Sequence, residues 1–195
     1  TPRGAVILSN VGQCVAPALA ALGCLLASRR AFTSAHRLGW KLLGASALSW
    51  SLGQLAWTYY EVSGAAAPFP SLADVGYLLA VPLALTAVWS MSVRTGTSSL
   101  LVAVLDALII AGGLLAISWP LVLGPSWDAG ADSPLLFALT LAYPIGNLIV
   151  ASAVLLAIMR TDRNRDAVPL VQIACGLLVL VAADSSWIIP AVGWP

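Results

Sequence analysis

Polar side chains at helical spacing within apolar segments are the residues of this chain best suited to chemistry. Trp50, Gln54, Trp57 and Glu61 follow one another at intervals of four, three and four, so they share one face of a helix. An amide or carboxyl group in hydrocarbon is costly unless it is paired or faces water. Because aromatic faces attract cations and apolar walls hold alkyl chains, this face is typical of a site for an amphipathic or cationic ligand.

Other segments carry polar residues that we expect at a similar depth. The first apolar segment contains an asparagine and a glutamine, and the last repeats the three-residue interval from a polar side chain to a tryptophan. At the start of the third segment, Asp74 can either cap the helix together with Ser71 or face the same site. An aromatic belt at the membrane surface is the alternative explanation of the tryptophans. The candidate ligand-binding residues are Asn10, Gln13, Gln54, Trp57, Glu61, Asp74, Tyr77, Asp184 and Trp187.

Missing residue types exclude several membrane chemistries. Lys41, the only lysine, lies at a segment boundary, so no lysine within a segment can carry a retinal-type Schiff base. His36, the only histidine, lies in a gap, which excludes bis-histidine haem ligation and Ser-His or Cys-His pairs within the spans. Asp106 and Asp184 lie toward opposite surfaces, too far apart to share a proton as in an aspartyl protease. We therefore expect no enzyme activity, no cofactor and no metal site.

The composition places these residues in a membrane. Hydrophobic residues make up 60% of the chain and charged residues only 9%, whereas a soluble domain carries about 25% charged residues. Six apolar segments are each long enough to cross the hydrocarbon core, which takes about 20 residues. They are Ala5–Ala27, Trp40–Tyr60, Leu72–Val93, Ser99–Leu123, Leu135–Met159 and Ala167–Ile189. Two further intramembrane polar residues, Asp106 and Asn147, fall within the fourth and fifth segments, and Asn147 is best explained as a hydrogen-bonding link between helices.

Basic residues fall in alternate gaps between these segments. Eight of the nine lysines and arginines lie after the first, third and fifth segments, whereas the gaps after the second and fourth carry acidic residues and no basic ones. Loops on the cytoplasmic side of membrane proteins are enriched in lysine and arginine. We therefore predict a multi-pass protein with its N-terminus outside. No basic stretch has the form of a nucleic-acid footprint, so no nucleic-acid partner is expected.

An internal repeat indicates tandem pairs of helices. The segments around Trp57 and Trp119 stand 62 residues apart, and Pro82 and Pro144 repeat at the same offset. Each pair would run out of the cytoplasm and return through a helix with a central proline. The predicted fold is therefore an all-α membrane bundle of six helices that forms one domain over residues 1–195. A seventh helix is expected to follow if the chain is a fragment.

One stretch resembles a known group of membrane regions. The letters LGQLAWTYYEVSG, followed by PFPSLADVGYLLAVPL, are similar to the multi-helix input regions at the N-termini of bacterial signalling proteins, above all GGDEF/EAL cyclic-di-GMP enzymes and sensor kinases of actinobacteria. The resemblance is best from Trp40 to about Trp89, and the cytoplasmic catalytic domains that follow such regions are not present in this sequence. The even helix count departs from that pattern, since a cytoplasmic output needs one more crossing. The residues that match are Gln54, Trp57, Tyr60, Glu61, Pro70, Ser71, Asp74 and Tyr77.

The first functional hypothesis is a noncatalytic sensory module in a bacterial cytoplasmic membrane. It would bind a small amphipathic or cationic ligand near the outer leaflet and signal to a cytoplasmic domain in cis or to a partner membrane protein. A small transporter or channel is the alternative, because Asp184, Asn147 and Asp106 form a polar series across the membrane. A structural subunit that packs against another membrane protein is the second alternative. The expected partners are membrane lipids, the small-molecule ligand, the signalling domain and, as an open alternative, a second copy of the chain.

Overall fold

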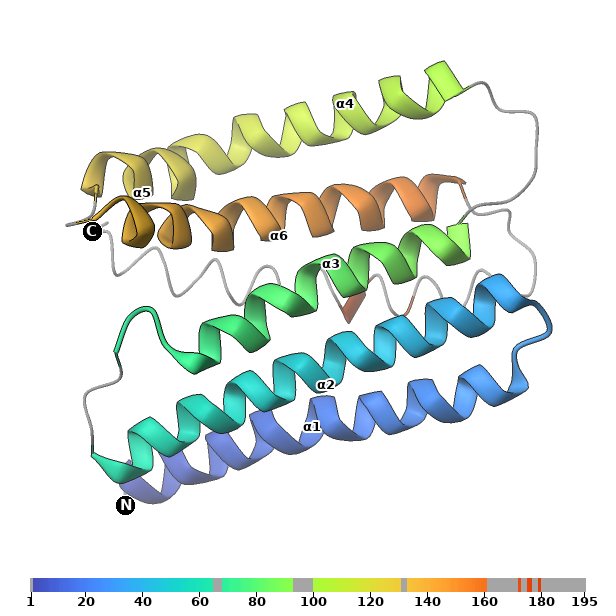
Figure 1. The fold of residues 1–195 in the computed structure, drawn as a ribbon. Coiled ribbons are helices and arrows are strands. Elements are labelled where there is room, and N and C mark those ends of the chain that lie inside the picture. The colour runs from blue at the N-terminus through green and yellow to red at the C-terminus, as the bar shows by residue number, and fades with distance from the viewer. Residues whose placement is uncertain are drawn as a thin grey trace. The chain divides into compact units, whose positions relative to one another are not determined.

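The computed structural model of the chain is entirely helical over the residues that it describes, which are 2–64, 68–92, 100–130 and 133–160 together with positions 172, 175, 176 and 179. These residues form two compact units, one ending at Met91 and one beginning at Ser92, and each is described by itself (Figure 1). The all-α prediction is confirmed. The prediction of a single domain stays a prediction.

The first unit consists of three long helices: α1 (Pro2–Arg30), α2 (Ser34–Ser63) and α3 (Leu72–Ser92). The short connection between α1 and α2 makes them an antiparallel pair that packs side by side (Figure 1). The Thr33 hydroxyl accepts a hydrogen bond from the backbone N–H of His36 at 3.1 Å and so caps the start of α2. Gly64 ends α2 in the left-handed region at a φ of 68°, which glycine adopts without strain.

Helices α2 and α3 approach so closely that their backbones touch. A Cβ atom added to Gly76 would lie 2.7 Å from the Cα of Gly53. Two serine hydroxyls of α2 donate across this contact, Ser49 to the Gly76 carbonyl at 2.8 Å and Ser46 to the Ala80 carbonyl at 2.7 Å. Small residues allow such close packing between membrane helices, where hydroxyl groups then bond across the contact. The contact fixes α3 against the face of α2 that carries the candidate site.

Helix α2 buries its small and polar residues and exposes its leucines. Leu48, Leu52 and Leu55 recur at helical spacing, and each is about half exposed. A helix of a soluble protein has the reverse arrangement, with its apolar stripe turned toward the core. The outer stripe is therefore suited to contact with lipid. The residues that α2 buries are Gly39, Gly44, Ser46, Ser51, Gly53 and Gln54.

The second unit contains two long helices and two short helical segments: α4 (Leu100–Ser118), the π-helical turn η1 (Trp119–Leu123), α5 (Gly124–Ala129) and α6 (Pro134–Arg160). The π-helical turn follows from Pro120, which has no backbone N–H to continue the α-helical hydrogen bonds. The backbone N–H of Gly124 instead donates to the carbonyl oxygen of Trp119, five residues back. A Cβ atom at Gly124 would lie 2.7 Å from that oxygen, so the turn requires glycine.

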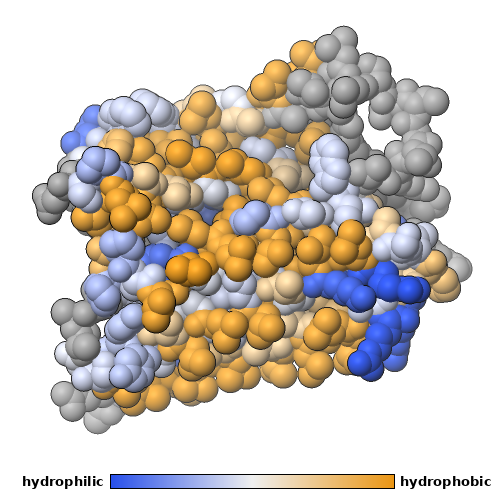
Figure 2. Space-filling model, in the orientation of Figure 1, coloured by the Kyte–Doolittle hydropathy of each residue, from blue (hydrophilic) through white to orange (hydrophobic). Residues whose placement is uncertain are grey.

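Four helical stretches in the described residues are long and apolar enough to cross a membrane. Apolar residues cover much of the visible surface of the helices (Figure 2). Four such stretches indicate a multi-pass membrane protein. They are Ile7–Arg30, Leu72–Met91, Leu108–Asp128 and Pro134–Leu156.

The predicted count of six spans is therefore corrected to four for the part of the chain that the structure describes. The segment Trp40–Tyr60 does form a helix, within α2, but it is not among the four candidate spans because serine, glycine and glutamine on its packed face lower its hydropathy. The segment Ala167–Ile189 lies almost wholly outside the described residues. Pro82 and Pro144 both lie inside helices, but Trp57 stands in an α-helix and Trp119 in a π-helical turn, so the predicted repeat is not matched in local structure there.

Candidate functional site

Four of the candidate residues form one hydrogen-bonded series across the three helices of the first unit. The Asn10 side-chain amide on α1 donates to a carboxylate oxygen of Glu61 on α2. The Gln54 amide donates to the Asn10 side-chain oxygen at 3.5 Å, and the Tyr77 hydroxyl on α3 donates to the Gln54 side-chain oxygen at 2.6 Å. We call Asn10, Gln54, Glu61 and Tyr77 the polar network. It links α1 to α2 and α2 to α3 through side chains alone.

The two central amides of the polar network are shielded from solvent, while one end is open. Asn10 is 5% exposed and Gln54 is 4% exposed, whereas Glu61 lies on the surface near the end of α2. Burial strengthens a hydrogen bond and also raises the cost of losing it, because an unpaired amide is left without water. The network therefore has a rigid interior and an accessible carboxylate at one end.

Aromatic side chains lie beside this network in different ways. The rings of Trp50 and Tyr77 are tilted at 49° to each other, with centroids 5.4 Å apart, so Trp50 supports the tyrosine that donates to Gln54. Trp57 is 38% exposed and makes no hydrogen bond or ring contact with another described residue. Trp50 therefore acts as packing for the network, and Trp57 stays a candidate for direct contact with a ligand.

Asp74 caps helix α3. One of its carboxylate oxygens accepts from the backbone N–H of Ser71 at 2.6 Å and from the Ser71 hydroxyl at 3.0 Å. The Ser71 hydroxyl in turn accepts from the backbone N–H of Ala73 at 3.2 Å. This reciprocal arrangement satisfies N–H groups that have no partner within the helix. Capping was one of the two explanations left open by the sequence, and a ligand contact from Asp74 stays a prediction.

Replacing Asp74 with alanine is expected to lower the free energy of unfolding by about 1 kcal/mol, the usual value of a helix cap. The Ser71 backbone N–H would lose its carboxylate partner, and the start of α3 would fray. Chemical unfolding in detergent micelles, followed by far-ultraviolet circular dichroism, measures the change. Replacing the exposed Asp128 of α5 with alanine is the matched control, and an equal loss in both variants would contradict a capping role.

Of the remaining candidates, Gln13 does not join the polar network, and two lie outside the described residues. Gln13 is exposed on α1 and donates to the Ser9 hydroxyl of the same helix at 3.0 Å, so it turns away from Asn10. Asp184 and Trp187 lie outside the described residues, and their predicted place at the site is untested.

The two intramembrane polar residues of the second unit differ in whether their side chains have interaction partners. Asp106 is partly buried on α4 and is not without a partner. The Asn147 side-chain nitrogen on α6 is buried and has no hydrogen-bond partner in the part of the chain that the structure describes. A buried amide N–H without a partner costs about 1–3 kcal/mol. The sequence predicted a link between helices for Asn147, and the described residues do not supply that link for its nitrogen.

Sequence reasoning missed the small residues that hold the helices of the site together. Besides the contacts of Ser46 and Ser49, the Ser51 hydroxyl donates to the Cys14 carbonyl oxygen at 2.7 Å and so joins α2 to α1. The relevant signal is the interval of four between small residues, which brings Ser49 and Gly53 to one face of α2. This spacing of small residues would have indicated the face of α2 that packs against α3, beside the polar network.

Among the residues that the structure describes, no group of three or more histidine, cysteine, aspartate or glutamate residues could hold a metal ion. The chain matches no protein family, no curated protein and no solved structure. The function must therefore be argued from the polar network itself.

Proposed function

We propose that the chain is a noncatalytic sensory or regulatory module of a bacterial cytoplasmic membrane. It binds a small amphipathic or cationic ligand near the outer surface and signals to a cytoplasmic domain or a partner membrane protein. The polar network carries the proposal, because its side chains join three helices in one hydrogen-bonded series. A ligand that takes one of these groups as its own partner breaks a link between helices and so shifts their packing.

The exposed end of the network favours a cation. Glu61 is bonded to an amide and makes no ion pair with any described residue, so no basic side chain there balances its charge. Trp57 lies one turn before it on α2 and is partly exposed. A cation with an apolar part can therefore pair with the carboxylate while its body lies against the indole ring. The exposed leucine stripe of α2 is suited to contact with lipid, from which an amphipathic ligand would enter.

Binding of tetraphenylphosphonium, an amphipathic cation, tests this proposal. The purified chain in lipid nanodiscs is expected to bind the labelled cation saturably, and Glu61→Gln is expected to weaken binding about fivefold, the value of an exposed ion pair worth ~1 kcal/mol. Equilibrium dialysis measures both affinities. Asp128→Asn removes another exposed carboxylate, on α5, and should leave the affinity unchanged. Equal affinities for Glu61→Gln and the parent chain would contradict the proposed site.

A second measurement separates a sensor from a passive binder. Leu8 on α1 and Val75 on α3 are 75% and 63% exposed and lie within the same unit, so each can carry a nitroxide label after replacement with cysteine. The three native cysteines would first be replaced with alanine. A sensor requires the distance between the labels to change when tetraphenylphosphonium saturates the chain. Binding with no change of distance would support a structural subunit.

A transporter is the second candidate, and the buried nitrogen of Asn147 is the observation that favours it. This nitrogen has no partner among the described residues and lies inside a candidate span, where a passing solute can bond to it. Uptake of labelled tetraphenylphosphonium into sealed proteoliposomes that is lost in Asn147→Leu would favour this function over sensing.

A further inference from the structure

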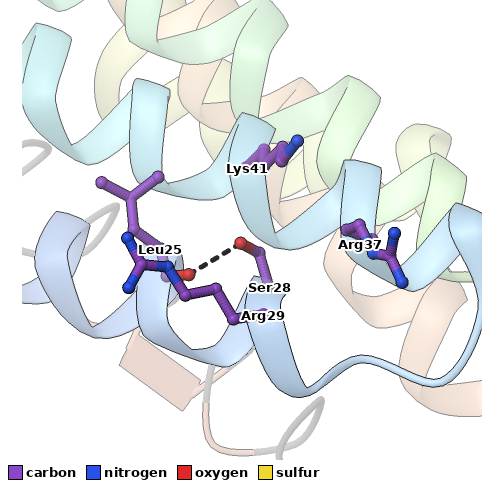
Figure 3. A pocket seen from close by; sticks show the side chains of 5 residues that line it. All are labelled: Leu25, Ser28, Arg29, Arg37 and Lys41. Carbon is purple, nitrogen blue, oxygen red and sulfur yellow. Dashed lines mark hydrogen bonds between the residues drawn. The ribbon is translucent and has the colours of Figure 1, made fainter.

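A second site lies on the first unit, far from the polar network. It is a pocket of about 530 Å³ between the end of α1 and the beginning of α2, where the two helices are joined. Leu25, Ser28 and Arg29 of α1 and Arg37 and Lys41 of α2 line it (Figure 3). Asn10 and Ser28 are separated by about 27 Å along α1 at 1.5 Å per residue, nearly the thickness of a hydrocarbon core. The pocket and the network therefore belong to opposite membrane surfaces.

The described residues that line this pocket carry only positive charge. Three of these five residues are cationic and none of the five is acidic. Arg29, Arg37 and Lys41 are exposed, and none of them makes an ion pair or a side-chain hydrogen bond with another described residue. A strongly hydrophilic patch is visible at the end of α1 and α2 where the two helices join (Figure 2). Like charges around one hollow repel each other, and an anion bound there relieves the repulsion.

One wall of the pocket and the residues beside it are apolar. Leu25 forms part of the lining and is 46% exposed, while the Ser28 hydroxyl is turned away to the Leu25 carbonyl oxygen at 2.7 Å. In the connection beside the pocket Phe32 is fully exposed, and Leu38 on the first turns of α2 is 52% exposed. The candidate span of α1 ends at Arg30, so these residues lie where hydrocarbon gives way to head groups.

We propose that this pocket binds the phosphate group of an anionic phospholipid. The two guanidinium groups can each offer paired N–H donors to phosphate oxygens, and Lys41 adds a point charge. The glycerol and upper acyl chains would lie against Leu25, and Phe32 would enter the head-group region. A free phosphate would meet the same cations but would gain nothing from the apolar wall, which is why the lipid is the expected occupant. This site does not depend on the function proposed for the polar network.

Titration of the detergent-solubilised chain with dioctanoyl-phosphatidylglycerol, followed by native mass spectrometry, tests the proposal. Each neutralised charge is expected to weaken binding about fivefold, so Arg29→Gln combined with Arg37→Gln should weaken it about 25-fold. The matched control is Arg30→Gln, which removes an equal charge from a neighbouring exposed residue that does not line the pocket. It should change the affinity less than about twofold.

Any of three results would overturn the proposed binding of an anionic phospholipid. An equal loss for Arg30→Gln and Arg29→Gln would show diffuse attraction to the basic loop rather than a site. Inorganic phosphate that binds as tightly as the lipid would assign the pocket to a soluble anion. Equal affinity for dioctanoyl-phosphatidylcholine would remove the preference for an anionic lipid. If the double variant fails to fold, Lys41→Gln alone is measured, with a fivefold loss expected from ~1 kcal/mol per charge.

Discussion

Replacing Gly76 with leucine is expected to lower the free energy of unfolding of the first unit by about 3 kcal/mol. The reason is the contact between the backbones of α2 and α3. Even the first carbon of a new side chain would lie 2.7 Å from the Cα and the nitrogen of Gly53 and 2.7 Å from the Ser49 carbonyl oxygen. Backbone atoms cannot rotate away as a side chain can, so α3 must move as a whole.

Moving α3 would also break the bonds that cross this contact. The hydroxyls of Ser46 and Ser49 donate to carbonyl oxygens of α3 at 2.7 and 2.8 Å, and Tyr77 reaches Gln54 at 2.6 Å. All of these require the present distance between the helices. The substitution therefore combines overpacking with the loss of buried hydrogen bonds, which is why a large effect is expected.

The control for this prediction is Gly12→Leu. Gly12 lies within α1 of the same unit, and a Cβ atom there would meet nothing within 4 Å. Leucine has the higher helix propensity, so this variant is expected to be more stable by about 0.5–1 kcal/mol. Chemical unfolding in detergent micelles measures both variants. A Gly76 variant as stable as the parent chain would show that α2 and α3 are not held at this distance.

The polar network was largely predictable from the sequence. Helical spacing placed Gln54 and Glu61 on one face of α2, and the rule that polar groups in hydrocarbon are paired selected Asn10 as a residue of similar depth. The structure joins these three in one series and adds Tyr77, which the sequence also selected. Depth arguments selected these residues because few amides and carboxylates occur in these helices, and that they bind a ligand stays a prediction.

Helix rotation was not predictable, and it explains where the sequence prediction and the structure differ. Gln13 lies within one turn of Asn10, yet it is exposed and bonds to Ser9 of its own helix. Hydropathy fixes which residues lie in the membrane, whereas packing against neighbours fixes which way they face. The role of Asp74 was undecided for a related reason, since a carboxylate at the start of a helix serves equally well as a cap or as a ligand contact.

The count of spans differed because α2 is not among the four candidate spans and the last predicted segment lies almost wholly outside the described residues. Helix α2 buries serine, glycine and glutamine and exposes leucine, so its average is lowered by residues that lipid does not reach. The π-helical turn after Trp119 was likewise not expected. It arises because Pro120 lacks a backbone N–H. The wide turn also brings Gly124 so close to the Trp119 carbonyl oxygen that a side chain would not fit there.

Replacing Gln54 with leucine is expected to lower the free energy of unfolding by about 2 kcal/mol. Gln54 is the central member of the polar network, and the change removes both the acceptor for the Tyr77 hydroxyl and the donor to Asn10. The two amides are at least 95% buried, so water does not readily replace the lost bonds. Gln13→Leu is the control, because it makes the same substitution at an exposed glutamine of the neighbouring helix and should change stability by less than about 0.5 kcal/mol.

A double-mutant cycle identifies how much of that loss belongs to the bond between α2 and α3. The free energy of unfolding is measured for Gln54→Leu, for Tyr77→Phe and for the double variant. The loss in the double variant should be about 1 kcal/mol smaller than the sum of the two single losses. Additive effects would mean that the two residues act separately and that no link passes through Gln54. The same cycle performed with tetraphenylphosphonium bound relates stability to function. A ligand that works by opening the network should reduce the coupling energy, whereas a ligand bound elsewhere should leave it unchanged.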